Sequence, residues 1–191
     1  MYKLCKTGQS AQRQRQLEEG LLQAMLARSY EEITISDLCE QLGIPRKAFY
    51  RYFSSKDGAL HALIDHTLLD FEQQTGILSG SGVGDIQVDL RHFFEFWQRQ
   101  KALLNALERS GLSGVLVQRA ISQAQSEYLL PYYPTSLDLR SMQHHAITFT
   151  ICGLMSMMTR WHRSGYAESP AEMARIAAAM LTQPLIRIPE K

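Results

Sequence analysis

Residues 32–57, which read EITISDLCEQLGIPRKAFYRYFSSKD, decide the fold of the N-terminal part of this chain. Thr34 followed three residues later by Asp37 is a capping-box pattern, which predicts that a helix begins at the threonine. Apolar residues at helical spacing continue this helix, and Gly43 supplies the left-handed turn that ends it. Pro45 suits the start of the next helix, because that position needs no backbone N–H. The pattern therefore predicts two short helices joined by a tight turn.

The second of these helices is predicted to bury one side and to expose a basic side. Phe49 and Phe53 are four residues apart, so they share a face that can pack inward. Arg46 and Lys47 fall on the other side, where they can donate hydrogen bonds to guanine edges or to phosphates. In a helix-turn-helix the first helix braces the second, whose exposed face enters the major groove of DNA. We therefore interpret residues 34–53 as a helix-turn-helix.

Positive charge is concentrated in the same part of the chain. The 191 residues carry a formal net charge of only +1. Residues 1–56 nevertheless hold nine Lys and Arg against six Asp and Glu, whereas the remainder holds eleven against thirteen. This asymmetry favours a polyanionic partner for the N-terminal part. Composition alone leaves open the alternative of an amphipathic helix whose charges are merely solvated.

The rest of the chain is also predicted to be helical. Apolar residues recur at helical spacing and sustained alternation is almost absent, which predicts an all-α fold. The Gly- and Ser-rich stretch at 76–84 is the expected loop. We predict a DNA-binding domain over residues 1–56 and a helical effector-binding and dimerisation domain over residues 57–191. Besides the two helices above, the expected helices span about 10–28, 56–75, 85–99, 101–110, 113–129, 138–163 and 169–182.

The quoted stretch closely resembles the N-terminal domain of the tetracycline-repressor (TetR) family. The likeness rests on a tyrosine, then an aromatic-Phe pair, then Ser-Lys-Asp entering a new helix. It covers about residues 12–70, with a weaker echo at 161–165 and 169–170. The resemblance implies an N-terminal three-helix DNA-binding domain followed by a helical C-terminal domain. It further implies a homodimer that binds a palindromic operator in double-stranded DNA, usually represses, and is released by a small effector. The odd number of cysteines, with no close pair among them, separately favours a cytoplasmic location.

The resemblance also implies which side chains meet DNA. The first three residues of the recognition helix match the family's base-facing positions, and its tyrosines match phosphate-contacting positions. Lys56 matches the lysine that begins the fourth helix, while Thr34 and Ser36 lie where second-helix contacts occur. The residues expected to contact DNA are Thr34, Ser36, Arg46, Lys47, Ala48, Tyr50, Arg51, Tyr52 and Lys56.

The chain departs from the family pattern at three positions. Ser29 replaces the usual Gly after the first helix, Pro45 replaces the usual Ser or Thr cap, and Lys47 replaces a common Gly. The lysine adds a further cation to the expected DNA-facing side. None of the three removes a core element of the motif.

A run of aromatic residues marks the predicted helix at 85–99. Together with later residues it could line an apolar cavity for an apolar or aromatic effector. The alternative is that these side chains simply fill the core between helices. The candidate effector residues are Phe93, Phe96, Trp97, Tyr128, Met142 and Phe149.

The last two predicted helices combine apolar, small and methionine side chains. Small residues permit close approach of helices, and methionines adapt to a partner surface. The resemblance implies that these helices pair with their copies in a homodimer. The alternative is that they pack wholly within one subunit.

Catalysis and bound cofactors are not indicated. His, Cys and carboxylate side chains do not cluster at ligand spacing, so we expect no metal site. The glycines lack the context of a phosphate loop, and candidate nucleophiles lack an evident base, so we expect neither a cofactor nor an enzyme. Hydropathy indicates no membrane association. The alternative function is a small-molecule-binding or protein-interaction module with degenerate operator binding.

Overall fold

The computed structural model describes residues 2, 5, 8–77, 84–124 and 139–182, with the side chains of 139–144 left out. Within these ranges the regular elements are helices, and one isolated antiparallel bridge joins Tyr2 to Phe53. The all-α prediction is confirmed. Most of the loop predicted at 76–84 and the end of the helix predicted at 113–129 lie outside the described residues.

The chain divides into two compact units. The first comprises residues 1–70 and 102–119, and the second comprises residues 71–101 and 120–191. The boundary by packing thus falls within helices rather than at residue 56, and the functional division at that residue stays a prediction. The helices of the first unit are α1 (Gly8–Ala27), the 3-10 turn η1 (Tyr30–Glu32), α2 (Ile35–Gln41), α3 (Arg46–Tyr50), most of α4 (Lys56–Thr75), most of α6 (Lys101–Arg109) and the first part of α7 (Ser113–Ala124). The second unit holds α5 (Ile86–Arg99), α8 (Leu139–Arg163) and α9 (Pro170–Thr182), besides the ends of α4 and α7.

Helix α1 packs its apolar stripe into the first unit. Leu17, Leu21 and Met25 are at most 2% exposed, as their spacing predicts. Gly20 lies where α1 meets α2, because a Cβ atom there would come within 2.8 Å of the Leu42 side chain. The glycine therefore permits the close approach of these two helices, and it was not singled out from the sequence.

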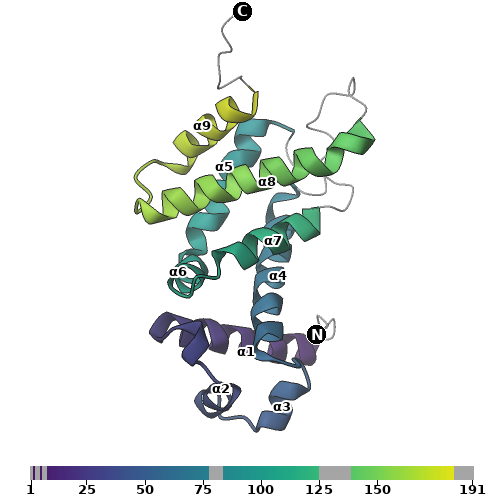
Figure 1. Ribbon diagram of the computed structural model, residues 1–191, viewed down its shortest axis with the longest axis vertical. Coiled ribbons are helices and arrows are strands. Elements are labelled where there is room, and N and C mark those ends of the chain that lie inside the picture. Colours follow the sequence, from purple (N-terminus) through teal and green to yellow (C-terminus); the bar gives the residue numbers. More distant parts are fainter. Residues whose placement is uncertain (1, 3–4, 6–7, 78–83, 125–138, 183–191) are drawn as a thin grey trace, which may run out of the picture. The chain divides into compact units, whose positions relative to one another are not determined.

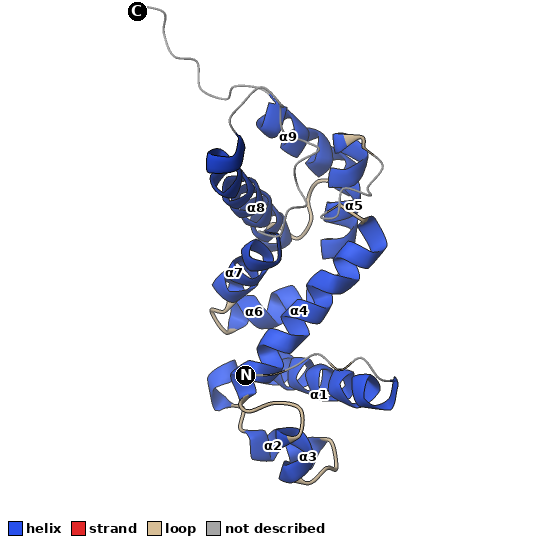
Figure 2. Cartoon of the chain, turned by 90° about the vertical axis from the view of Figure 1, so that its right-hand side faces the viewer, coloured by secondary structure: helices blue, strands red, loops and turns tan. Residues whose placement is uncertain are grey.

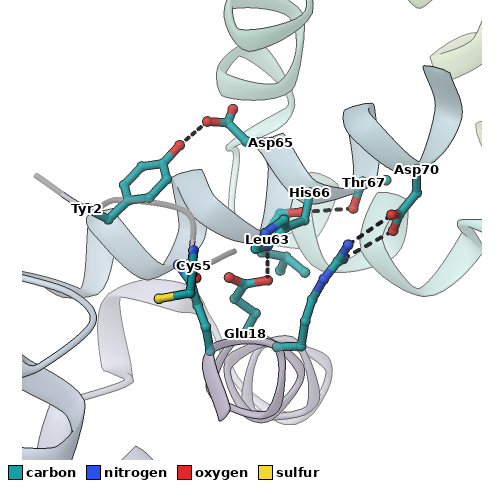
Figure 3. Close-up of polar contacts among 10 residues, drawn as sticks. Tyr2, Cys5, Glu18, Leu63, Asp65, His66, Thr67 and Asp70 are labelled. Atoms are coloured by element: carbon teal, nitrogen blue, oxygen red, sulfur yellow. Dashed lines mark hydrogen bonds and ion pairs between the residues drawn. The ribbon is translucent and has the colours of Figure 1, made fainter. Parts of the chain in front are cut away.

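Two polar pairs join α1 to α4, and Figure 3 shows the contact between His66 and Glu18. His66 Nδ1 lies 2.7 Å from Glu18 Oε2, and both side chains are buried. Arg15 makes two hydrogen bonds to Asp70, of 2.8 and 3.1 Å, but this pair is exposed. The same two helices thus offer a buried polar pair and an exposed ion pair for comparison.

Asp65, on the same helix α4, is held by two further segments of the first unit. It pairs with Arg119 of α7, whose Nε donates a 2.7 Å hydrogen bond to Oδ1. The Tyr2 hydroxyl also hydrogen-bonds Asp65 (Figure 3) and accepts a 2.8 Å bond from Arg119. The segment at Tyr2 is thereby tied both to α4 and, through its bridge, to the residue that follows the turn after α3.

In the second unit α5 packs along α9, and α8 contacts both. Phe94 of α5 meets Trp161 of α8 edge to face, with ring centroids 5.4 Å apart. The Trp161 indole N–H donates to the Glu168 carbonyl at 2.9 Å. In the described part of the chain no helix is both long and apolar enough to cross a membrane.

Candidate nucleic-acid interface

Helix α2 begins and ends as its sequence predicts. The Thr34 hydroxyl accepts from the Asp37 amide at 3.1 Å, and the Asp37 carboxylate accepts from the Thr34 amide at 3.0 Å. The Thr34 hydrogen bonds lower the pKa of Asp37, so the carboxylate stays charged at the positive end of the helix. Gly43 has a φ of +62°, and its amide and that of Ile44 bond to carbonyls of the last turn. The turn between α2 and α3 is therefore fixed by a Schellman-type end.

Helix α3 is shorter than predicted. It spans Arg46–Tyr50, whereas the sequence pattern predicts a helix from about Pro45 to Phe53. Pro45 occupies the cap position, with a φ of −70° that suits the ring. After Tyr50 the chain tightens, because the Tyr52 amide bonds to the Phe49 carbonyl at 2.9 Å.

The two phenylalanines anchor this short helix as predicted. Phe49 is 0% exposed and Phe53 is 1% exposed, and their ring centroids lie 5.4 Å apart. The Phe53 amide also donates to the Phe49 carbonyl at 3.1 Å, which keeps both rings on the inner side. Burial of this pair fixes which face of α3 is turned outward.

The outward face carries most of the residues expected to contact DNA. Arg46, Lys47, Tyr50 and Arg51 are exposed. The Arg46 guanidinium lies over the Tyr50 ring, 6.0 Å from its centroid, with a long hydrogen bond of 3.4 Å to the hydroxyl. Ala48 is half-buried. The outward face therefore offers three cations and one phenol within two helical turns.

The expected contacts outside α3 differ in their surroundings. Thr34 and Ser36, at the start of α2, are exposed, while Tyr52 is half-buried. The structure thus brings the expected residues of α2 and α3 onto one helix-turn-helix, and their contacts with DNA stay a prediction.

Lys56 is engaged within the chain. Its ammonium donates to the carbonyls of Tyr30 and Ile33, at 2.6 and 2.8 Å, and lies 4.1 Å from the centroid of the Tyr30 ring. These contacts join the start of α4 to η1 and to the chain that enters α2. Its expected phosphate contact stays a prediction, because two of its three N–H donors already bind carbonyls.

Tyr30 supports the helix-turn-helix from outside the motif, and the sequence analysis did not identify it. It is 4% exposed, and its hydroxyl donates a 2.6 Å hydrogen bond to Asp57. Burial, followed by that hydrogen bond, raises the pKa of Tyr30, so the phenol stays protonated as the donor. The preceding Ser29 has a φ of −68°, which a non-glycine residue adopts without strain. Replacement of the family's glycine there therefore fits this loop.

Helix α6 completes the end of α1. The Arg109 guanidinium donates to the carbonyls of Leu26 and Ala27, at 2.7 and 3.5 Å. Ser110 Oγ accepts from the Tyr30 amide at 3.2 Å. Carbonyls in the last turn of a helix lack partners within the helix, so residues from far along the chain satisfy them here.

The candidate effector residues separate into three groups. Phe93, Phe96 and Trp97 are buried in the second unit, where they pack with Phe71. We call these four residues the aromatic cluster. Phe149 is 77% exposed and takes no part in it. Tyr128 and the Met142 side chain lie outside the described residues.

This all-α fold, with its capped and anchored α2–α3 pair, defines a helix-turn-helix DNA-binding protein. Residues 20–63 match the family of "Bacterial regulatory proteins, tetR family". The match identifies an N-terminal DNA-binding domain like that of TetR-family transcriptional regulators. No curated protein sequence matches it significantly.

Solved structures share the fold over nearly the whole chain. The fatty acid degradation regulator FadR from Bacillus halodurans is 15% identical, with a TM-score of 0.59 over 96% of this chain and 100% of that chain. The TetR family repressor AlkX from Dietzia sp. strain DQ12-45-1b is 18% identical, with a TM-score of 0.55 over 87% of this chain and 92% of that chain. The dihydroxyacetone kinase operon activator DhaS is 15% identical, with a TM-score of 0.53 over 88% of this chain and 93% of that chain. At these identities the likeness concerns the fold alone.

Proposed function

We propose that this chain is a homodimeric repressor that binds a palindromic operator through α2 and α3 and is released from it by a small-molecule effector. The observation that carries the proposal is the division of α3 between the buried Phe49 and an exposed face of Arg46, Lys47 and Tyr50. The repressor role and the effector rest on the family resemblance, and the cytoplasmic location rests on the cysteine pattern of the sequence.

The geometry of α3 suits recognition from its N-terminal end. In a helix-turn-helix the first residues of the recognition helix reach base edges, while its neighbours hold phosphates. Arg46 and Lys47 are the first two residues of α3, so they are the proposed base readers. Tyr50, four residues after Arg46, is a proposed phosphate contact. An effector that favours one separation of the two recognition helices in the dimer would change the affinity for DNA.

Selection from a random DNA pool tests the operator proposal. We expect the wild-type protein to enrich a palindrome and Arg46→Ala to lose that enrichment, because a bidentate arginine contact contributes about 1–3 kcal/mol to base discrimination. Lys101→Ala is the matched control, since it removes one exposed cation outside the helix-turn-helix. No enrichment by folded wild-type protein, or equal enrichment by Arg46→Ala, would contradict operator binding and favour the degenerate module.

Helix α8 carries the surface that we propose for dimerisation. His145, Phe149, Gly153, Ser156 and Arg160 form an exposed stripe at helical spacing. Phe149 is 77% exposed, so packing its ring against a partner would remove apolar surface from water. Helix α9 adds Met180 and Leu181, which are 45% and 37% exposed. We therefore assign Phe149 to the dimer face rather than to an effector site.

Gly153 supports the same assignment. A Cβ atom added there would meet nothing within 4 Å, so no neighbour within the chain requires the glycine. Glycine inside a helix nevertheless costs roughly 0.5–1 kcal/mol relative to alanine. Close approach of a partner helix would account for this residue.

Gly153→Glu is expected to convert the dimer to monomer without loss of thermal stability of the subunit. The new side chain would bury a charge in the helix contact, whereas in the free subunit it fills open space and removes a helix-destabilising glycine. Analytical ultracentrifugation over a range of concentrations measures the change. Gly114→Glu on α7 is the matched control, because that glycine is also exposed with open space around it. An unchanged dimer in Gly153→Glu, or equal dissociation in the control, would rule out this face.

A further inference from the structure

Two buried side-chain polar atoms among the described residues lack a hydrogen-bond partner. They are Glu18 Oε1, in the first unit, and Trp97 Nε1, in the second. Trp97 is 1% exposed, so its indole N–H is out of contact with bulk water. The other tryptophan, Trp161, is equally buried, but its N–H donates to the Glu168 carbonyl. An unpaired buried donor destabilises a fold, so its presence at Trp97 calls for a reason.

The surroundings of Trp97 are the aromatic cluster. Its ring lies 5.4 Å from that of Phe96, nearly perpendicular to it, and 6.3 and 6.4 Å from those of Phe93 and Phe71. These rings offer dispersion contacts but no strong hydrogen-bond acceptor. The cluster therefore combines apolar ring faces with a single unused donor. The Arg99 guanidinium, 5.8 Å from the Phe96 ring centroid, is exposed and hydrogen-bonds Gln74.

We propose that the Trp97 N–H is the polar anchor of the effector site, and that the effector is a small apolar molecule with one neutral hydrogen-bond acceptor such as a ketone, ester or ether oxygen. The proposal rests on the proposed function in taking a small effector as given. Since an indole N–H only donates, the ligand must supply the acceptor. A carboxylate placed against these rings would be buried beside apolar neighbours at a far larger cost than a neutral carbonyl.

Acetophenone and ethylbenzene form a matched pair of probes, because they differ only in a carbonyl against a methylene group. Ligand-observed NMR titrations of the full chain, without DNA, give the affinity of each. We expect the ratio of ketone affinity to hydrocarbon affinity to fall about three- to tenfold in Trp97→Phe, the range that one net hydrogen bond supplies. The ratio cancels the different hydrophobicity of the two probes. Trp161→Phe should leave it unchanged.

A second measurement uses the wild-type protein. The chain has two tryptophans, so its indole N–H region holds two signals, which the two Trp→Phe variants assign. We expect acetophenone to shift the Trp97 signal downfield in a saturable way, and ethylbenzene not to do so. Three results would each overturn the proposal that the Trp97 N–H anchors the effector. They are an equal affinity ratio in wild type and Trp97→Phe, an unmoved Trp97 signal, and no saturable binding of either probe. Because both measurements are made without DNA, such failure leaves operator binding untouched, and failure of the DNA selection leaves the anchor untouched.

Discussion

His66→Ala is expected to lower the free energy of unfolding of the first unit by about 1–3 kcal/mol, the range typical of leaving a buried hydrogen-bonding group without its partner. The substitution removes the partner of Glu18 Oε2, while Glu18 Oε1 is already without one. Glu18 is 1% exposed, so water cannot replace the imidazole. Urea denaturation followed by far-UV circular dichroism measures the loss, and hydrogen exchange at α1 amides locates it.

The neighbouring ion pair provides the control. Arg15→Ala breaks the Arg15–Asp70 pair between the same two helices, but those side chains are 44% and 38% exposed, so we expect a loss of at most about 1 kcal/mol. The double variant Glu18→Leu/His66→Leu should recover most of the lost stability, because apolar side chains can replace a buried pair. Equal losses of unfolding free energy in His66→Ala and Arg15→Ala would show that the buried pair stabilises the protein no more than the exposed pair does.

Phe49→Ala is expected to lower the free energy of unfolding by about 3–5 kcal/mol and to abolish specific DNA binding. The ring is fully buried in the anchor of α3, and small domains have only about 5–15 kcal/mol of stability to lose. A lower urea midpoint together with loss of operator binding at physiological temperature is the expected result.

Tyr50→Ala separates stability from recognition on the same helix. Tyr50 is 47% exposed, so its removal should change stability by less than about 1 kcal/mol while it weakens DNA binding. Circular dichroism and a DNA-binding titration on both variants make the comparison. If Tyr50→Ala were as destabilising as Phe49→Ala, or bound the operator like wild type, the assignment of inner and outer faces to α3 would be wrong.

Local signals in the sequence were enough to predict the helix-turn-helix. The Thr34–Asp37 capping box, the left-handed Gly43 and the buried Phe49 and Phe53 each depend on residues within a few positions. The fourth helix was likewise placed at Lys56–Thr75, where the structure has it. The end of α3 was predicted three residues too late, because tightening of the chain after Tyr50 keeps the apolar spacing while it ends the regular helix.

The contacts that hold these helices together could not be predicted from the sequence. Glu18 and His66 are 48 residues apart, and Asp65 and Arg119 are 54 apart, so helical spacing carries no information about their pairing. Periodicity likewise cannot reveal that two backbone carbonyls lie within reach of the Lys56 ammonium. A usable signal was missed at Gly20, since an isolated glycine inside a helix often marks close packing.

The hydrogen bonds from the end of α6 to the end of α1 affect which segments can be exchanged between regulators. The carbonyls of Leu26 and Ala27 and the Tyr30 amide find their partners about 80 positions further along the chain, at Arg109 and Ser110. A chimaera that transplanted only residues 1–56 would therefore carry a DNA-binding domain that lacks Arg109 and Ser110, the hydrogen-bond partners at the end of α1. The transferable unit is therefore discontinuous in sequence. To keep its structure in another protein, the transplanted segment must be accompanied by residues 102–119.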